Sequence, residues 1–173
     1  MIAGFSFSIF ACSQKPISGI DLKSGEPFST PTLTKSKGTV VVFLSAKCPC
    51  SQSHESSIET LAKEFSDFTF VGVHSNLDEN EELSAKHFKQ AALSFPVIQD
   101  KEARIANEYG ALKTPHVFVV GPKGECWYRG GVDDTKDASR AKQFYLKNVL
   151  LDLKEGREPR QTTARALGCS IKR

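Results

Sequence analysis

Short apolar runs and amphipathic stretches alternate along most of this chain. The run at 39–44 (TVVVFL) is continuous and rich in β-branched residues, which is typical of a strand covered on both faces. Further strands are predicted at 68–73, 95–98, 116–120 and 126–129. Apolar residues at helical spacing predict helices near 51–65 and at 81–93, 102–109 and 138–153. This alternation predicts an α/β fold, a three-layer α/β/α sandwich whose mixed sheet has helices on both faces.

Three of the predicted helices carry more specific expectations. We expect Leu83 and Phe88 of the second helix to point toward the core. We expect the same of Phe144 and Val149 in the last helix. Gly110 follows the third helix and is predicted as its C-cap.

The composition is that of one globular domain. The chain has 173 residues, of which 39% are hydrophobic and 25% charged, and these values exclude a disordered or fibrous protein. No apolar run approaches the roughly 20 residues of a membrane-spanning helix. The net charge is +3, and residues 154–173 hold six basic and two acidic side chains, which leaves the first 153 residues at −1. A body so close to neutral argues against nucleic acid as the main partner.

The N-terminal end of the chain has the features of a targeting segment. Residues 1–12 are predicted as a leader, because the apolar stretch at 3–11 ends in a small residue directly before Cys12. This arrangement resembles the end of a bacterial lipoprotein signal, in which Cys12 takes the lipid and attaches the protein to the membrane. The alternative is an ordinary cleaved signal. Both predict export across the inner membrane, to the periplasm or to a lipid anchor on the cell envelope.

Composition also divides the rest of the chain. Residues 13–38 are rich in Ser, Lys, Pro and Gly and are predicted as a linker with irregular or short hairpin structure. Residues 39–153 form the predicted domain, and residues 154–173 are predicted as an exposed, flexible, basic tail that carries Cys169. Without Cys12 four cysteines remain, an even number that suits an oxidising compartment.

The most informative motif is Cys48-Pro49-Cys50-Ser51, at the junction between a buried strand and a helix. In open α/β sheets, sites form at the carboxyl ends of strands. Unpaired backbone N–H groups at a helix N-terminus favour a thiolate, and Lys47 can add positive charge beside Cys48. The motif therefore predicts a nucleophilic thiol at Cys48.

Other interpretations of the cysteines also follow from the sequence. Free cysteines can be inert packing residues, and Cys126, next to Trp127 in the predicted hairpin, is assigned to the core on this ground. A zinc site of Cys48, Cys50, Cys126 and Cys169 would lack the paired Cys-x-x-Cys spacing of structural zinc. The sequence contains no haem or nucleotide motif either, so we predict neither a metal nor a cofactor.

Two polar residues of the predicted helix at 51–65 can tune the thiols. Ser51, at the helix start, can hydrogen-bond a thiolate. His54 lies one helical turn after Cys50 and can reach the thiols, with a solvated position on the helix as the equal alternative.

A second motif is Thr114-Pro115, directly before the strand at 116–120. A proline at a strand entrance can have a cis peptide bond. Together with the Cys-Pro-Cys-Ser turn, this motif resembles the thioredoxin fold over residues 20–153, and most closely its redoxin branch of peroxiredoxin-like and cytochrome-maturation proteins. The resemblance implies a thioredoxin-type sandwich and thiol–disulfide exchange, with Thr114 and Pro115 lining the groove that binds the partner's chain.

The C-terminal segment carries a further resemblance. Gly168-Cys169-Ser170-Ile171 is similar to the Gly-Cys-Pro-Ile-like tail of a bacterial redoxin subfamily. This likeness implies that Cys169 is a resolving cysteine that reaches the active site. A Cys48–Cys50 disulfide would close a very small ring across Pro49, so we expect Cys48–Cys169 to be the stable oxidised form and Cys50 to form a short-lived alternative.

Several residues depart from the patterns of these families. Ser51 stands where thioredoxins have their second cysteine, and Lys47 replaces the usual aromatic residue. Peroxiredoxins have Pro and Thr or Ser seven and three residues before their reactive cysteine; here Ser45 fits but Val41 does not. They also tend to carry an arginine where this chain has Thr114-Pro115. The departures place disulfide exchange ahead of peroxide reduction.

The sequence as a whole predicts an enzyme, a thiol-disulfide oxidoreductase of the cell envelope. Cys48 attacks, and either Cys50 or Cys169 resolves the mixed disulfide. Its expected partners are protein thiols or disulfides and an upstream thiol reductant or oxidant. The alternatives are a thiol peroxidase that uses Cys48, and a redox-inactive binding module with the same fold.

Overall fold

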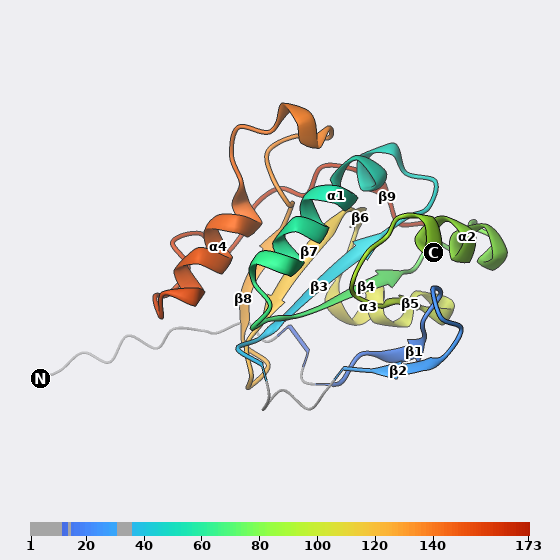
Figure 1. The fold of residues 1–173 in the computed structure, drawn as a ribbon, viewed down its shortest axis with the longest axis horizontal. Coiled ribbons are helices and arrows are strands. Elements are labelled where there is room, and N and C mark those ends of the chain that lie inside the picture. Colours follow the sequence, from blue (N-terminus) through green and yellow to red (C-terminus); the bar gives the residue numbers. More distant parts are fainter. Residues whose placement is uncertain (1–11, 14, 31–35) are drawn as a thin grey trace, which may run out of the picture.

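A five-stranded sheet in the order β5-β4-β3-β7-β8 forms the centre of the computed structural model, which describes residues 12–13, 15–30 and 36–173 (Figure 1). β3 (Thr39–Leu44), β4 (Thr69–His74) and β5 (Val97–Gln99) run parallel to one another. β7 (His116–Val120) pairs antiparallel with β3 and with β8 (Cys126–Gly130), so β7 runs against the other four strands of this sheet. The predicted mixed sheet is confirmed.

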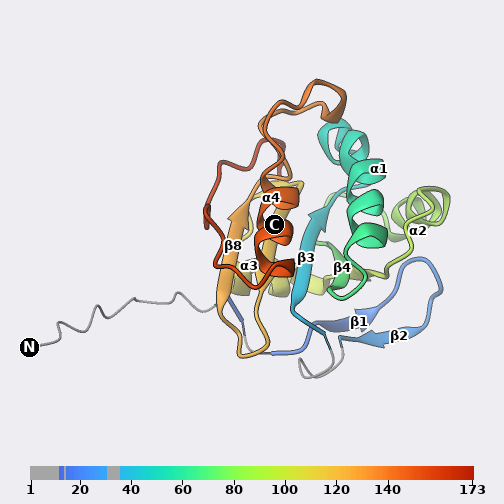
Figure 2. The same ribbon diagram turned by 60° about the vertical axis from the view of Figure 1, so that its left-hand side comes forward.

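Helices cover both faces of this sheet (Figures 1 and 2). On one face lie α1 (Pro49–Glu64), α2 (Glu81–Gln90) and α4 (Tyr145–Lys154), and on the other lies α3 (Arg104–Tyr109), which ends at Gly110 as predicted. Alternate residues of β3 face opposite sides of the sheet. Val40 and Val42 therefore pack in the core under α1, α2 and α4, and Val41 packs in the core under α3. All six residues of β3 are buried, which explains its unbroken apolar sequence.

Two smaller sheets flank the central one. β1 (Ser18–Ile20) and β2 (Pro27–Ser29) form an antiparallel hairpin, and a short hairpin is one of the structures predicted for residues 13–38. β6 (Lys113–Thr114) pairs antiparallel with β9 (Cys169–Ser170) from the C-terminal end. None of the helices in the described part of the chain is long and apolar enough to cross a membrane.

The prediction of a flexible tail at 154–173 is wrong in this structure. β9 pairs with β6, and the next residue, Ile171, buries its side chain against the core beside α3. The Ile171 N–H donates to the Leu112 carbonyl at 3.0 Å. Apolar burial and backbone pairing therefore hold a segment whose polar composition gave no periodic signal.

The two helices with predicted inner faces also differ in detail. Leu83 is exposed, whereas Phe88 is buried as expected. The last helix begins only at Tyr145, after a short 3₁₀ turn, η2 (Ala138–Arg140), so Phe144 precedes it and is exposed. Val149 is buried as predicted.

A disulfide joins Cys12 to Cys126 at the start of β8, across a sequence separation of 114 residues. This bond corrects two predictions. Cys126 is a disulfide partner and not only a packing residue, and Cys12 belongs to the fold. A sulfur already bonded to another sulfur cannot also carry a thioether-linked lipid, so this structure contradicts lipidation of Cys12. Residues 1–11 of the predicted leader lie outside the described residues.

Loss of this disulfide is expected to destabilise the fold, because the bond closes a long loop and so restricts the unfolded chain. The double variant Cys12→Ser/Cys126→Ser should lose about 2–5 kcal/mol of unfolding free energy. Urea denaturation of the oxidised proteins measures the difference. Equal denaturation midpoints for variant and wild type would contradict a stabilising role.

Candidate active site

The reactive turn begins where β3 ends and α1 starts. Cys48 is the N-cap of α1, with extended backbone angles, and Pro49 occupies the first helical position. Proline suits this position because its N–H would have no partner there and its φ is already helical. The Cys48 sulfur therefore lies at the N-terminus of a 16-residue helix, next to the Ser51 N–H, and the Cys48 residue is only 3% exposed.

A buried carboxylate holds the loop between β3 and Cys48 in place. Glu79, from the segment between β4 and α2, accepts hydrogen bonds from the Ser45 hydroxyl and from the N–H groups of Ala46 (2.8 Å) and Lys47 (3.2 Å). The Ser45 oxygen in turn accepts from the Cys48 N–H at 3.0 Å. One side chain thus fixes the backbone that presents the nucleophile.

Polar partners keep the Glu79 carboxylate ionised in its buried position. His74 Nε2 lies 3.1 Å from it, and Asn76 Nδ2 donates to it at 2.6 Å. Burial raises the pKa of Glu79, but its interactions with His74, Ser45 and Asn76 outweigh this effect and lower the pKa to about 2. No sequence signal marks Glu79 as functional, because it lies in a run of acidic and polar residues, 78–82, that resembles a solvated loop.

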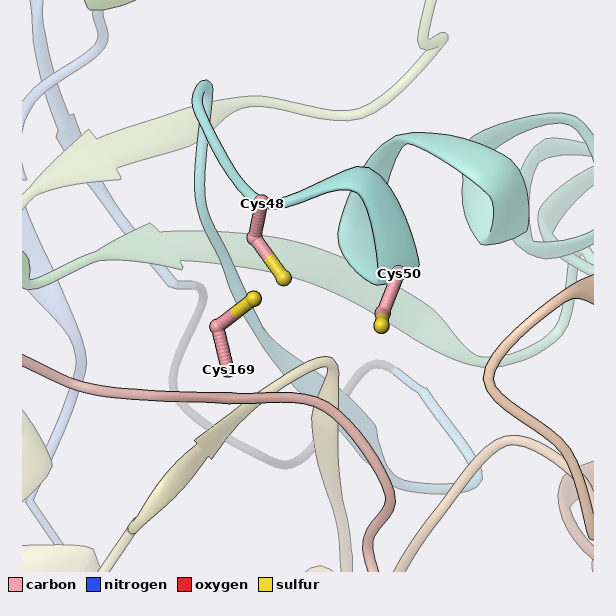
Figure 3. A group of neighbouring side chains, drawn as sticks. All are labelled: Cys48, Cys50 and Cys169. Atoms are coloured by element: carbon pink, nitrogen blue, oxygen red, sulfur yellow. The ribbon is translucent and has the colours of Figure 1, made fainter.

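The three free cysteines of the described chain converge at this turn (Figure 3). The sulfurs of Cys48 and Cys169 point toward one another, and the Cys50 side chain lies to one side of them, in the first turn of α1. All three sulfurs lie within 4.8 Å of one another. The register of β6 and β9 sets this arrangement, because it places Cys169 directly opposite Thr114. When protonated, the Cys48 thiol donates to the Thr114 carbonyl at 3.2 Å.

Hydrogen bonds make Cys48 the most acidic of the three thiols. Burial raises the pKa of Cys48, but hydrogen bonds from the side chains of Cys169 and Thr114 and from the N–H groups of Ser51 and Cys169 outweigh it, so the pKa is lowered. The Thr114 hydroxyl is buried without a hydrogen-bond partner in the described chain, which leaves it available to the Cys48 thiolate.

The other two thiols respond in the opposite direction. Burial, the hydrogen bond to Cys48 and the charges of Cys48 and Cys50 raise the pKa of Cys169 to about 12. Burial and the charge of Cys48 also raise the pKa of Cys50, against the opposing charge of Lys136. Cys48 is therefore the thiol of the cluster that ionises most readily.

The residues predicted to tune the thiols, Ser51, Lys47 and His54, make different contacts in the structure. The Ser51 side chain accepts from the Ser45 N–H at 3.0 Å, so its contribution to the thiolate comes from its backbone. The Lys47 ammonium donates to the Asp78 carbonyl at 3.1 Å and does not bond to a cysteine. His54 is buried rather than solvated.

His54 also contacts backbone and not sulfur. Its Nδ1 lies 2.6 Å from the Cys50 carbonyl, and its Nε2 lies 3.0 Å from the Asp133 carboxylate. The imidazole thus connects the first turn of α1 to the segment after β8. It positions the backbone of Cys50, which corrects the prediction that it reaches the thiols.

Thr114 and Pro115 lie beside the cysteines, as the resemblance implied. The Thr114–Pro115 peptide bond is cis. Gly168 passes so close to this turn that a Cβ on it would collide with the Thr114 carbonyl, which explains glycine directly before Cys169. The structure therefore brings together Cys48, Cys50, Thr114, Pro115 and Cys169.

Comparison with known proteins assigns the chain to a family. Residues 14–129 match the AhpC/TSA family. The chain belongs to this family. No curated protein matches it. An uncharacterized conserved protein from Geobacillus kaustophilus is 23% identical to it, and the alignment covers 95% of this chain and 93% of that one, with a TM-score of 0.83.

Two further solved structures are named for redox chemistry. The peroxidoxin BcpB of Mycobacterium tuberculosis is 18% identical, with 85% of this chain and 97% of that one covered and a TM-score of 0.65. The thioredoxin domain of a thiol-disulfide oxidoreductase from Bacteroides vulgatus is 26% identical, with 69% and 86% covered and a TM-score of 0.56. The predicted thioredoxin-type fold and the resemblance to redoxins are confirmed.

The stabilising effect of Glu79 is expected to depend on pH. Its pKa is lower in the folded protein than in the unfolded chain, so its contribution is complete above about pH 5 and is lost as the pH falls toward 2. Glu79→Gln should remove roughly 3 kcal/mol of unfolding free energy at pH 7. It should also reduce the loss of unfolding free energy between about pH 5 and pH 2, which is called the acid limb here. Denaturation curves from pH 7 to pH 2 measure both effects.

The exposed Glu158 provides the matched control for this experiment. Glu158→Gln should keep the wild-type acid limb. Parallel pH dependences for wild type and Glu79→Gln would show that the buried carboxylate does not supply the effect.

Proposed function

We propose that this AhpC/TSA family member is a thiol-disulfide oxidoreductase in which Cys48 attacks and Cys169 resolves. The observation that carries the proposal is the pairing of β6 with β9, which sets the Cys169 sulfur against the Cys48 sulfur. The lowered pKa of Cys48 supports its role as the nucleophile, because the thiolate is the reactive form.

The first step forms a mixed disulfide with the partner. The Cys48 thiolate attacks one sulfur of a partner disulfide, and the second partner sulfur leaves as a thiolate that takes a proton from water. Cys169 then loses its proton to water, attacks the Cys48 sulfur and displaces the remaining partner sulfur. The partner is released with two thiols, the enzyme holds a Cys48–Cys169 disulfide, and an external dithiol returns the two electrons.

The electrostatics of the cluster give these steps their order. In the resting enzyme, burial and the neighbouring Cys48 thiolate hold the pKa of Cys169 near 12, so Cys169 stays protonated. Once Cys48 is bonded to a partner, its negative charge and its hydrogen bond to Cys169 are gone. The pKa of Cys169 then falls, and the resolving thiol ionises only after the mixed disulfide exists.

The Cys12–Cys126 disulfide supports a site of action in an oxidising compartment. Structural disulfides persist in secreted and periplasmic proteins and are rare in the cytosol. We therefore place the proposed activity outside the cytosol, with protein disulfides as the substrates and a dithiol protein as the electron donor.

A thiol peroxidase is the second candidate, and membership of the AhpC/TSA family favours it. Here the Cys48 thiolate would attack a peroxide oxygen, release the alcohol or water and become a sulfenic acid. The Cys169 thiol would then condense with the sulfenic acid to the same disulfide and release one water. Val41 and the Thr114-Pro115 pair, which depart from the peroxiredoxin pattern, place this reaction second.

Turnover with two substrates tests the proposal. The protein should accelerate the reduction of insulin disulfides by dithiothreitol and should consume hydrogen peroxide far more slowly. Cys169→Ser should accumulate mixed disulfides with the partner, whereas Cys50→Ser should accumulate few, as read by mass spectrometry of trapped species. Accumulation in Cys50→Ser alone would assign resolution to the local pair, and peroxide turnover without insulin reduction would assign the enzyme to the second candidate.

The ordered ionisation gives a separate prediction. In the wild type, Cys48 should react with iodoacetamide at lower pH than Cys169. Cys48→Ala removes both the charge and the hydrogen bond that hold the Cys169 proton, so the pH midpoint for alkylation of Cys169 should fall. Peptide-level mass spectrometry across a pH series measures each cysteine. An unchanged Cys169 profile in the variant would refute the coupling.

A further inference from the structure

One sulfur of the cluster has no assigned part in the proposed exchange. Attack and resolution use Cys48 and Cys169, yet the Cys50 sulfur also lies within 4.8 Å of both of their sulfurs, to one side of the facing pair (Figure 3). The Cys50 carbonyl is also held, by the buried imidazole of His54 at 2.6 Å. The contact with His54 thus holds the backbone of Cys50, and with it the third thiol, in a fixed position in the site.

The spacing of the three sulfurs matches a different kind of chemistry. They come from three positions, the N-cap of α1, its first turn and the strand β9, and all lie within 4.8 Å of one another. A metal–thiolate bond is about 2.3 Å long, so a planar three-sulfur site needs its sulfurs about 4 Å apart. The largest separation in the observed cluster, at most 4.8 Å, exceeds that spacing by less than about 1 Å.

The donor set determines which metal fits. The cluster consists of three cysteines, with no histidine or carboxylate among the described residues that form it. Structural zinc takes four protein ligands, and magnesium or calcium take oxygen. Soft thiolates select Cu(I), which also accepts three-coordinate sites. We propose that Cys48, Cys50 and Cys169 form a three-thiolate binding site for Cu(I).

Protonation and charge fit such an ion. Cysteine binds a metal as the thiolate, so binding of one Cu(I) by the three sulfurs releases whatever protons they carry. The bound centre carries two net negative charges. The N-terminus of α1 and the nearby Lys136 side chain oppose this charge, and affinity falls at lower pH because protons compete for the sulfurs.

Metal binding and disulfide exchange exclude one another at this site. A Cys48–Cys169 disulfide removes two of the three ligands, so only the reduced protein binds Cu(I). The ion in turn occupies the nucleophile and blocks attack on a partner disulfide. The prediction that no metal binds followed from cysteine spacing along the chain, whereas the three sulfurs meet because β9 brings Cys169 to the Cys-Pro-Cys turn.

An anaerobic titration tests the proposal on the full chain. The active-site thiols are reduced while the Cys12–Cys126 disulfide is kept, which is verified by a count of three thiols per chain. Cu(I) is then supplied in competition with a chromogenic Cu(I) chelator. We expect one ion per chain, and X-ray absorption should find three sulfur neighbours at about 2.3 Å.

Variants separate the three-sulfur site from ordinary thiol binding. Cys50→Ser and Cys169→Ser should each weaken binding at least about 100-fold, whereas Ser170→Ala, in the same strand, should not change it. Circular dichroism verifies that each variant is folded. Oxidation to the Cys48–Cys169 disulfide should abolish binding and release the ion.

Three results would contradict the proposal that this cluster binds Cu(I). One is failure of the wild type to take Cu(I) from the chelator. The second is full affinity in Cys50→Ser or only two sulfur neighbours, which would indicate a simple two-thiol complex. The third is binding of Zn(II) in preference to Cu(I). The insulin assay is independent, so a protein that binds Cu(I) but reduces no disulfide would refute only the proposed exchange activity.

Discussion

A two-residue antiparallel pairing, between Lys113–Thr114 and Cys169–Ser170, is the constraint on which the site depends. It sets the Cys169 sulfur against Cys48 and lets the Thr114 carbonyl and hydroxyl face the same atoms. So short a ladder would not hold by itself. Ile171 buries its side chain directly after it, and Lys172 donates its N–H to Asn76 at 2.9 Å, next to the Glu79 network.

That last contact connects two parts of the site which the chain keeps far apart. Asn76 bonds on one side to the Glu79 carboxylate, which holds the loop before Cys48, and on the other to the backbone that follows Cys169. The nucleophile and its resolving partner are therefore positioned by one buried polar network. Because most of its donors and acceptors are paired, the network holds the two segments in a fixed relation.

The local features of the fold could be predicted from the sequence. The strand at 39–44, the helix after Cys48 and the alternation of strands and helices follow from periodicity within short windows. The contacts missed are all long-range. Glu79 looks like any acid in a polar loop, and neither the partner of Cys12 nor the docking of the tail leaves a trace in residue spacing. The spacing of His54 from Cys50 indicates a tuning residue, but the spacing gives no sign of Asp133, whose carboxylate lies next to His54 Nε2 in the structure.

The docked tail has a consequence for competition with thiols in solution. A thiol on a short tether has an effective concentration in the millimolar range even when the tether is flexible, and strand pairing raises it further. A free thiol must therefore reach at least about millimolar concentration before it intercepts a mixed disulfide at Cys48 ahead of Cys169. Below that level, the chain itself and not the surrounding thiol pool decides how fast a bound partner is released.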